Sequence, residues 1–202
     1  MSTFAQERSN VVSSTGDVLV NGKPLLPEQS IYAGDTISTG TRSNLVVVMR
    51  SSAFQVRPNT KLMFEGALSS QIVKTLRLIN GAIVSVWGKG EERKIVTPTM
   101  VAGIRGTGVY TEVFEKQDNR TYICTCYGTV ELTSGQYKQI SSTQYHEAFW
   151  AETTHQRDKP FTPAKMLNHT DEELEFLAQL VNQKTAWQIS GRKKHQDGYD
   201  NY

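Results

Sequence analysis

The sequence has little of several features that define large classes of protein. Only two cysteines occur among 202 residues, which excludes a small disulfide-built scaffold. No run reaches the roughly 18 apolar residues of a transmembrane helix, and no basic segment followed by an apolar one marks a signal peptide. Lys and Arg number 22 against 20 Asp and Glu. This balance gives no strong field to attract nucleic acid or an anionic membrane, so no nucleic-acid partner is predicted.

Signatures of catalysis are also missing. The sequence contains no G-x-S-x-G elbow, no H-E-x-x-H helix and no paired-carboxylate pattern. The glycines from Gly103 to Gly108 could cradle a phosphate, but their spacing differs from G-x-G-x-x-G and they lead into a strand instead of a helix. We interpret them as a tight turn that places Arg105 beside a sheet. The sequence therefore predicts a binding or relay protein and not an enzyme.

The sequence is rich in short β-branched runs separated by turn residues, at a spacing typical of sandwiches, barrels and β-rolls. Asn21-Gly22 and Asn80-Gly81 lie between such runs and predict hairpins with type I′ turns. The second hairpin would join residues 74–79 to 82–87. Further strands are predicted at 36–39, 45–49, 53–57, 61–65, 109–114, 121–127 and 129–133. We expect an all-β fold, a single β-roll, short β-solenoid or sandwich-like domain of antiparallel hairpins.

One short C-terminal amphipathic helix is expected beyond the strands. Thr170-Asp171-Glu172-Glu173 forms a capping box, and an apolar stripe that begins at Leu174 predicts a helix from Asp171 to Gln183 docked on the sheet. The chain then divides into a flexible N-terminal segment (1–15), a β domain (16–155), a loop with the docked helix (156–189) and a disordered tail (190–202).

The two cysteines are the sharpest local feature. Side chains alternate along a strand, so Cys124 and Cys126 face the same side, about 6.6 Å apart, with parallel Cβ vectors that disfavour a disulfide. Two thiolates on one face suit a soft or borderline metal ion, namely zinc, iron or copper. The alternative is a pair of inert thiols in the core, because cysteine is often buried.

Histidines could complete a metal site at the cysteine pair. His146 lies on the next predicted strand or its turn and is the candidate third ligand, although a lone histidine in a β domain is more often simply hydrogen-bonded. His169 and His155 are weaker candidates for a fourth ligand; His169 precedes the helix cap, where a structural role is equally natural. Aromatic neighbours are expected to exclude water from the site: Tyr122, Tyr127, Phe149 and Trp150.

Short motifs follow one another in a defined order between residues 16 and 132. They are Gly16-Asp17-Val18, Gly34-Asp35-Thr36-Ile37-Ser38-Thr39-Gly40, Phe54-x-Val56-x-Pro58-Asn59-Thr60-x-Leu62, Leu76-x-Leu78-x-x-Gly81-Ala82-Ile83, Val96-Thr97-Pro98, Ile104-Arg105-Gly106-Thr107 and Gly128-Thr129-Val130-Glu131-Leu132. In this order they resemble the FecR-like domain family. The Thr-Pro pair followed by Arg-Gly-Thr is the most specific part.

The resemblance implies an extracytoplasmic, for example periplasmic, β domain of a regulator. Such domains are often tethered to a membrane helix and to a cytoplasmic segment that controls a sigma factor. The resemblance therefore implies a protein partner in the cell envelope and a precursor that is secreted or membrane-anchored. This sequence departs from the pattern at Arg50-Ser51-Ser52, where the family often has Asp-Gly-Ser, and adds the cysteine pair and the C-terminal helix. Two alternatives stay open, a metal-binding or redox-sensing module centred on Cys124, Cys126 and His146, and a purely structural envelope domain.

Overall fold

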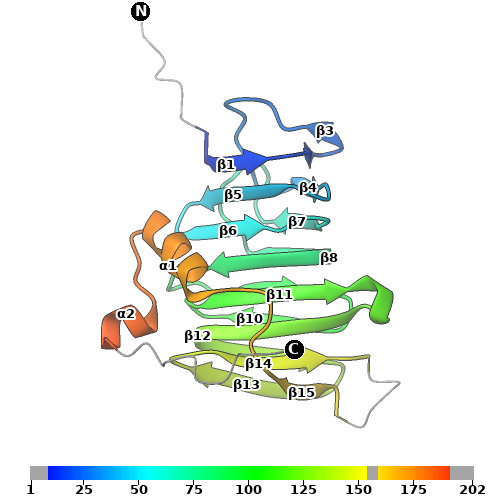
Figure 1. Cartoon of the computed structure of the whole chain (residues 1–202), viewed down its shortest axis with the longest axis vertical. Helices are drawn as coiled ribbons and strands as arrows, with labels where there is room; N and C mark the ends of the chain where they lie inside the picture. Colours follow the sequence, from blue (N-terminus) through cyan, green and yellow to red (C-terminus); the bar gives the residue numbers. More distant parts are fainter. Residues whose placement is uncertain (1–8, 154–158, 192–202) are drawn as a thin grey trace, which may run out of the picture.

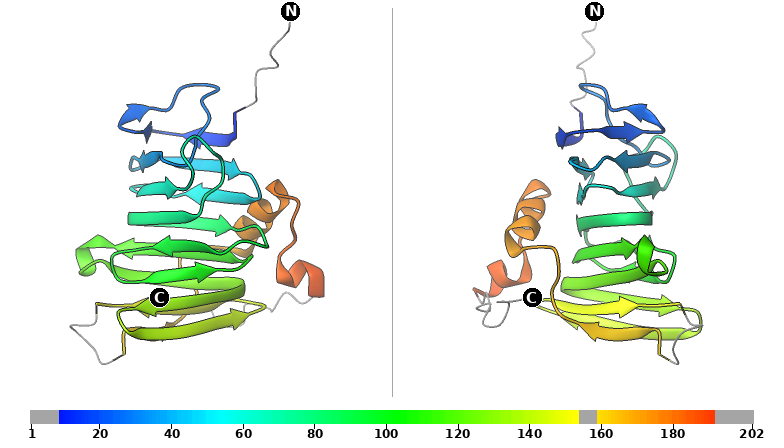
Figure 2. Two further views of the ribbon diagram at one scale, coloured as in Figure 1. Left: turned by 180° about the vertical axis from the view of Figure 1, so that it is seen from behind. Right: turned by 45° about the vertical axis from the view of Figure 1, so that its right-hand side comes forward.

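The computed structural model describes residues 9–153 and 159–191, and this part of the chain forms two β-sheets that face each other, with two short helices outside one of them (Figures 1 and 2). Sheet A contains β1 (Val11–Thr15), β5 (Asn44–Met49), β6 (Ser52–Val56), the second half of β8 (Thr75–Val86), β11 (Gly108–Phe114), the first half of β12 (Arg120–Ser134), β14 (Glu147–Ala151) and β15 (Phe161–Ala164). Sheet B contains β2 (Val18–Val20), β3 (Lys23–Pro24), β4 (Thr36–Thr39), β7 (Lys61–Glu65), the first half of β8, β9 (Arg93–Val96), β10 (Val101–Ile104), the second half of β12 and β13 (Tyr137–Thr143).

The all-β expectation is confirmed, and the chain winds between the two sheets as a β-roll. The strand pairs are antiparallel except for β8 with β9, which is parallel. A 3-10 turn (Glu115–Gln117) joins β11 to β12. The apolar core between the sheets includes Ile37, Phe54 and Trp87, none of which is exposed.

Two long strands pass from one sheet to the other, and glycine marks each crossing. β8 bends at Gly81 (φ +81°) and β12 at Gly128 (φ +93°). A Cβ at Gly81 would lie 2.3 Å from the Thr60 hydroxyl oxygen, so only glycine fits. The hairpin predicted at Asn80-Gly81 is therefore wrong, because these residues form a bend within one strand. The hairpin at Asn21-Gly22 is confirmed as the β2–β3 connection.

The burial pattern shows which face of sheet A is covered. In β8, residues 75–80 alternate between buried and exposed, whereas 82–86 are all buried. β12 repeats this, with 121–127 continuously buried and alternation after Gly128. Successive residues of a strand are all buried when both faces of the strand are covered. Sheet A therefore has the inter-sheet core on one side and a second apolar cluster on the other.

Helices α1 (Asp171–Leu180) and α2 (Ala186–Ser190) cover the outer face of sheet A (Figure 2). The predicted capping box is present, with Thr170 accepting from the Glu173 amide and Glu173 accepting from the Thr170 amide. Leu174 and Leu177 are fully buried in the second cluster. The docked helix is thus confirmed, but it ends at Leu180 instead of Gln183, and α2 follows it behind its own capping box.

Other expected boundaries differ as well. Residues 11–15, expected in the flexible N-terminal segment, form β1 and pair with β5. Residues 161–164, expected in a loop, form β15 and pair with β14. The strands predicted at 121–127 and 129–133 are one strand, β12. Most of the predicted disordered tail and residues 1–8 lie outside the described residues.

Candidate metal centre

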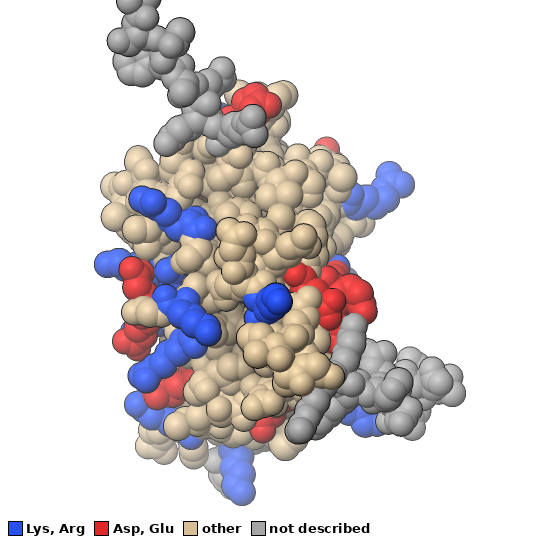
Figure 3. Space-filling view, turned by 90° about the vertical axis from the view of Figure 1, so that its left-hand side faces the viewer, with Lys and Arg blue, Asp and Glu red and all other residues tan. Residues whose placement is uncertain are grey.

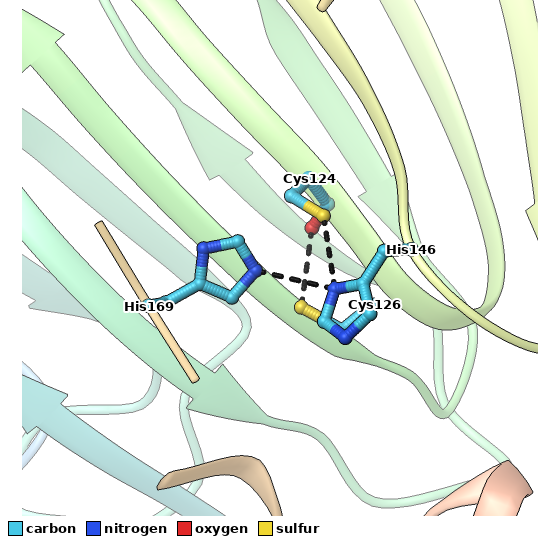
Figure 4. Close-up of side chains that lie close together, drawn as sticks. All are labelled: Cys124, Cys126, His146 and His169. Atoms are coloured by element: carbon cyan, nitrogen blue, oxygen red, sulfur yellow. Dashed lines mark hydrogen bonds between the residues drawn. The ribbon is translucent and has the colours of Figure 1, made fainter. Parts of the chain in front are cut away.

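The side chains of Cys124, Cys126, His146 and His169 converge on the outer face of sheet A (Figure 4). Both cysteines lie on β12 and both belong to the cluster beneath the helices, as the two-residue period predicted. His146 immediately precedes β14, where its amide donates to the Cys126 carbonyl at 2.9 Å. His169 precedes the α1 cap, Thr170. One ligand atom from each of the four residues lies within 4.8 Å of all the others.

The closest approaches join nitrogen and sulfur atoms. His146 Nδ1 lies 3.4 Å from Cys124 Sγ and 3.3 Å from His169 Nε2. The Cys126 thiol donates to the Cys124 carbonyl oxygen over a distance of 3.7 Å between Sγ and O. His146 therefore lies at the centre of the group, with one nitrogen directed at both a thiol and a second imidazole.

The other nitrogen of each histidine has a partner that sets its tautomer. His146 Nε2 lies 2.8 Å from Asp171 Oδ1, and His169 Nδ1 lies 2.7 Å from the Leu167 carbonyl oxygen. A carboxylate and a carbonyl can only accept, so these two nitrogens carry the protons. Tyr145 also donates to Asp171, at 3.0 Å. When both rings are neutral, the nitrogens left with free lone pairs are therefore His146 Nδ1 and His169 Nε2, which face each other.

The four side chains are buried. Both cysteines are fully buried, and the histidine side chains sit under the helical segment, with His169 only 6% exposed. The Tyr110 ring stacks on His169 at a centroid distance of 4.6 Å, and the Trp187 ring stacks on His146 at 5.4 Å. Water has little access to such a site, which strengthens electrostatic interactions within it.

The aromatic surroundings were only partly predicted. Tyr122 and Tyr127 belong to the same cluster as the cysteines, and Trp150 packs against its edge. Phe149 does not, because it points into the core between the sheets, so its expected role at the site is wrong. Adjacent residues on a strand face opposite sides, and Trp150 takes the outer side.

The surroundings of Cys124 and His146 favour the ionised pair, a thiolate beside a protonated imidazole. Burial opposes ionisation of Cys124, but hydrogen bonds from Cys126, His146 and His169 outweigh it and lower the pKa of Cys124. Burial, together with the adjacent Cys124, raises the pKa of Cys126. Burial alone would lower the pKa of His146, yet Cys124 and Asp171 raise it above its usual value. The site thus readily holds a thiolate, which is the form that binds metals.

His146 has an uncommon backbone conformation, with φ +30°. Few non-glycine residues adopt positive φ, and such conformations gather at functional sites because surrounding contacts must hold them. Here those contacts are the Cys126 carbonyl on the backbone and Asp171 on the ring. The fold therefore holds the imidazole in one orientation toward the sulfur atoms.

All four predicted ligands lie together, and their role as ligands stays a prediction. The weaker candidate His155 lies outside the described residues. Sequence reasoning missed Asp171, Tyr145 and Trp187. A capping box at Thr185 and Gln188 was a usable signal for the helix that carries Trp187.

The charged surface beside the helices carries both signs. On the face seen in Figure 3, the largest group of Asp and Glu side chains lies at the right, and Lys and Arg side chains line the left with further acidic side chains between them. The first turn of α1 supplies Glu172 and Glu173, whereas Asp171 in the same turn is buried against His146. This face therefore carries no continuous basic surface.

Comparisons with known proteins agree with this architecture. Residues 35–131 match the family model described as FecR protein, which confirms the resemblance predicted from the motifs. The matched range spans the motifs from Asp35-Thr36 to Gly128-Thr129, whereas Gly16-Asp17-Val18 precedes it. The match includes Cys124 and Cys126, whereas His146 and His169 follow it. The comparison with curated proteins gave no match.

Two crystal structures of a "putative anti-sigma factor" from Parabacteroides distasonis ATCC 8503 share the fold. Both are 12% identical to this chain with a TM-score of 0.52; one alignment covers 64% of this chain and 59% of that structure, the other 71% and 64%. The chain spans about three fifths of these structures, and at this identity the likeness describes the fold alone. Neither helix of the described part is long and apolar enough to cross a membrane.

Proposed function

We propose that this chain is the extracytoplasmic, non-catalytic part of a regulator and acts by binding a protein in the cell envelope. The observation that carries this proposal is the FecR-like domain at residues 35–131. Domains of this family belong to regulatory signalling proteins. The location outside the cytoplasm and the protein partner are the parts that need experiment.

The fold comparison also supports a regulatory role that depends on protein contact. The two crystal structures compared above are described as a "putative anti-sigma factor", and an anti-sigma factor acts by contact with another protein. A β-roll has broad faces and rigid turns on which a partner can be recognised without deep pockets. We therefore expect recognition on the surface, with the buried cysteine and histidine cluster serving the stability of that surface.

Localisation is the first test. In the encoding organism, the full natural protein should be cleaved by a protease added to cells whose outer barrier is opened, while cytoplasmic markers stay intact. Full protection alongside the cytoplasmic markers would refute the extracytoplasmic location.

Regulation is the second test. Deletion of the gene should change the transcripts of a defined gene set, and the wild-type gene should restore them. Phe176 on α1 and Ile140 on β13 are exposed apolar side chains, 43% and 68% accessible, and serve as surface probes. If the chain acts by protein contact, Phe176→Asp or Ile140→Asp should abolish the restoration without lowering the melting temperature. Unchanged transcripts after deletion would contradict regulation and favour a structural envelope role.

Metal binding is a second candidate function, favoured by the four converging donor atoms. It is compatible with regulation, because the cluster is buried and leaves the outer surfaces available. Metal content measures it directly and does not depend on the partner.

A further inference from the structure

We propose that Cys124, Cys126, His146 and His169 bind one zinc ion, which clamps the C-terminal helical segment onto the outer face of sheet A. This inference does not depend on the regulatory function. It starts from the two imidazoles. His146 Nδ1 and His169 Nε2 lie 3.3 Å apart, and in the neutral rings the protons sit on the other nitrogens, which point to Asp171 and to the Leu167 carbonyl. Two lone pairs at this distance repel unless a proton or a cation lies between them.

The distances fit a tetrahedral cation, and the number of converging atoms favours a cation over a shared proton. Zinc in proteins is tetrahedral, with bonds of about 2.0–2.1 Å to nitrogen and about 2.3 Å to sulfur, which places two nitrogen ligands about 3.3 Å apart and a nitrogen and a sulfur about 3.5 Å apart. The observed separations are 3.3 Å between the nitrogens and 3.4 Å from His146 Nδ1 to Cys124 Sγ. A shared proton needs only two atoms, one that carries it and one that accepts it. Here four converge within 4.8 Å.

Charge also favours zinc. Two thiolates neutralise a zinc dication, so the ion and its sulfur ligands together add no net charge to the apolar cluster. Zinc-binding histidines usually donate their second nitrogen to a carboxylate or a carbonyl. Both partners are present, in Asp171 for His146 and the Leu167 carbonyl for His169. Four protein ligands with no open position are typical of a structural zinc site and not of a catalytic one.

The origin of the ligands defines the role of the ion. Cys124 and Cys126 come from β12, which lies between β11 and β14 in sheet A, and His146 immediately precedes β14. His169 lies on the connection between β15 and α1. Asp171, the first residue of α1, holds the His146 ring. An ion bound to these residues therefore links two strands to the helical segment at the N-terminal end of α1.

A redox role for the cysteines is the competing explanation. It would require the two thiols to lose two electrons and two protons to an oxidant and form a disulfide. Both are fully buried, and neighbouring same-face positions on a strand do not give disulfide geometry without distortion. Zinc binding instead requires no such distortion of β12 and protects the thiolates from oxidation.

Metal analysis of the full chain, purified without chelator, tests the proposal. We expect about one zinc per chain, with iron and copper well below stoichiometric amounts. Removal of zinc with a chelator should lower the melting temperature by several degrees, and zinc sulfate alone should restore it. Cobalt should bind in its place and give the visible bands of tetrahedral coordination together with a thiolate charge-transfer band.

Variants separate ligand loss from simple destabilisation. Cys126→Ser and His169→Asn should each lose the stoichiometric zinc and the stabilisation by added zinc. Leu177→Ala is the matched control, because it removes buried methyl groups from the same cluster but no ligand. It should lower the melting temperature and keep the zinc. If a ligand variant does not fold, chelation and restoration of the wild-type chain still decide the question.

Three results would overturn the zinc proposal. The first is purified wild-type chain without stoichiometric metal whose melting temperature does not respond to zinc. The second is a mass two hydrogens lower than the reduced chain, which would show a disulfide. The third is stoichiometric zinc that persists in both ligand variants. None of these results would bear on the regulatory function, which the transcript measurement tests separately.

Discussion

The substitution Leu177→Ala tests whether α1 is an integral part of the β-roll. Leu177 is fully buried between α1 and sheet A, in the cluster that also contains Leu174, Ala178 and Trp187. Truncation of a buried leucine costs about 2–5 kcal/mol, from lost transfer free energy and the cavity left behind. With a central value of about 3 kcal/mol, and about 2–4 °C per kcal/mol for a chain of this size, we expect the melting temperature to fall by about 6–12 °C.

The assay is thermal unfolding followed by circular dichroism, at wavelengths that report helix and strand separately. Both signals should shift together, because α1 contacts β6 and β8 in the middle of sheet A. Phe176→Ala is the control on the same helix, since Phe176 is 43% exposed and should cost little. An unchanged strand transition, with only the helix signal lost early, would show that α1 unfolds alone and would refute this account of the packing.

Three further predictions concern the bend, the metal centre and the buried tyrosines. Gly128→Ala should lower the free energy of unfolding by about 1–3 kcal/mol in a denaturant titration, because φ is +93° and the new Cβ would lie 2.4 Å from Thr107 Cγ2. The control Gly22→Ala, also at positive φ but with open space around it, should lower it less. Asp171→Asn should weaken zinc affinity about 10–100-fold in a competition assay while zinc still binds, because the His146 ring loses its charged partner. An unchanged affinity would show that Asp171 does not orient the His146 ring for zinc. Burial raises the pKa of three tyrosines above the ordinary 10.0, so unfolded chains ionise first and stability should fall as the pH rises beyond about 10. Phenolate absorbance equal to that of all eight tyrosines, reached without loss of structure, would contradict this. The three tyrosines are Tyr110, Tyr122 and Tyr127.

Local patterns in the sequence predicted those parts of the fold that local chemistry decides. Asn21-Gly22 forms a hairpin because both residues take positive φ between short strands. Asn80-Gly81 has the same letters but becomes a bend, because the following residues pair with β6 and β11 in the other sheet. Those partners are distant in sequence, and no local signal identifies them. The same limit explains why β12 was predicted as two strands.

The candidate site divides in the same way. The period of two along β12 places Cys124 and Cys126 on one face, and this followed from the sequence alone. The approach of His169 requires the segment after β15 to fold back over sheet A, which only tertiary packing decides. The partnership of Asp171 with His146 joins residues 25 positions apart and was likewise hidden.

X-ray absorption at the zinc edge of the purified chain tests the central claim most directly, because it reports the atoms bound to the ion. The account predicts two sulfur ligands at about 2.3 Å and two nitrogen ligands at about 2.0–2.1 Å, with the multiple-scattering pattern of imidazole. In Cys126→Ser, any zinc that still binds should show one sulfur fewer. A first shell of oxygen and nitrogen alone, without sulfur, would place the ion elsewhere and contradict the Cys124, Cys126, His146 and His169 centre.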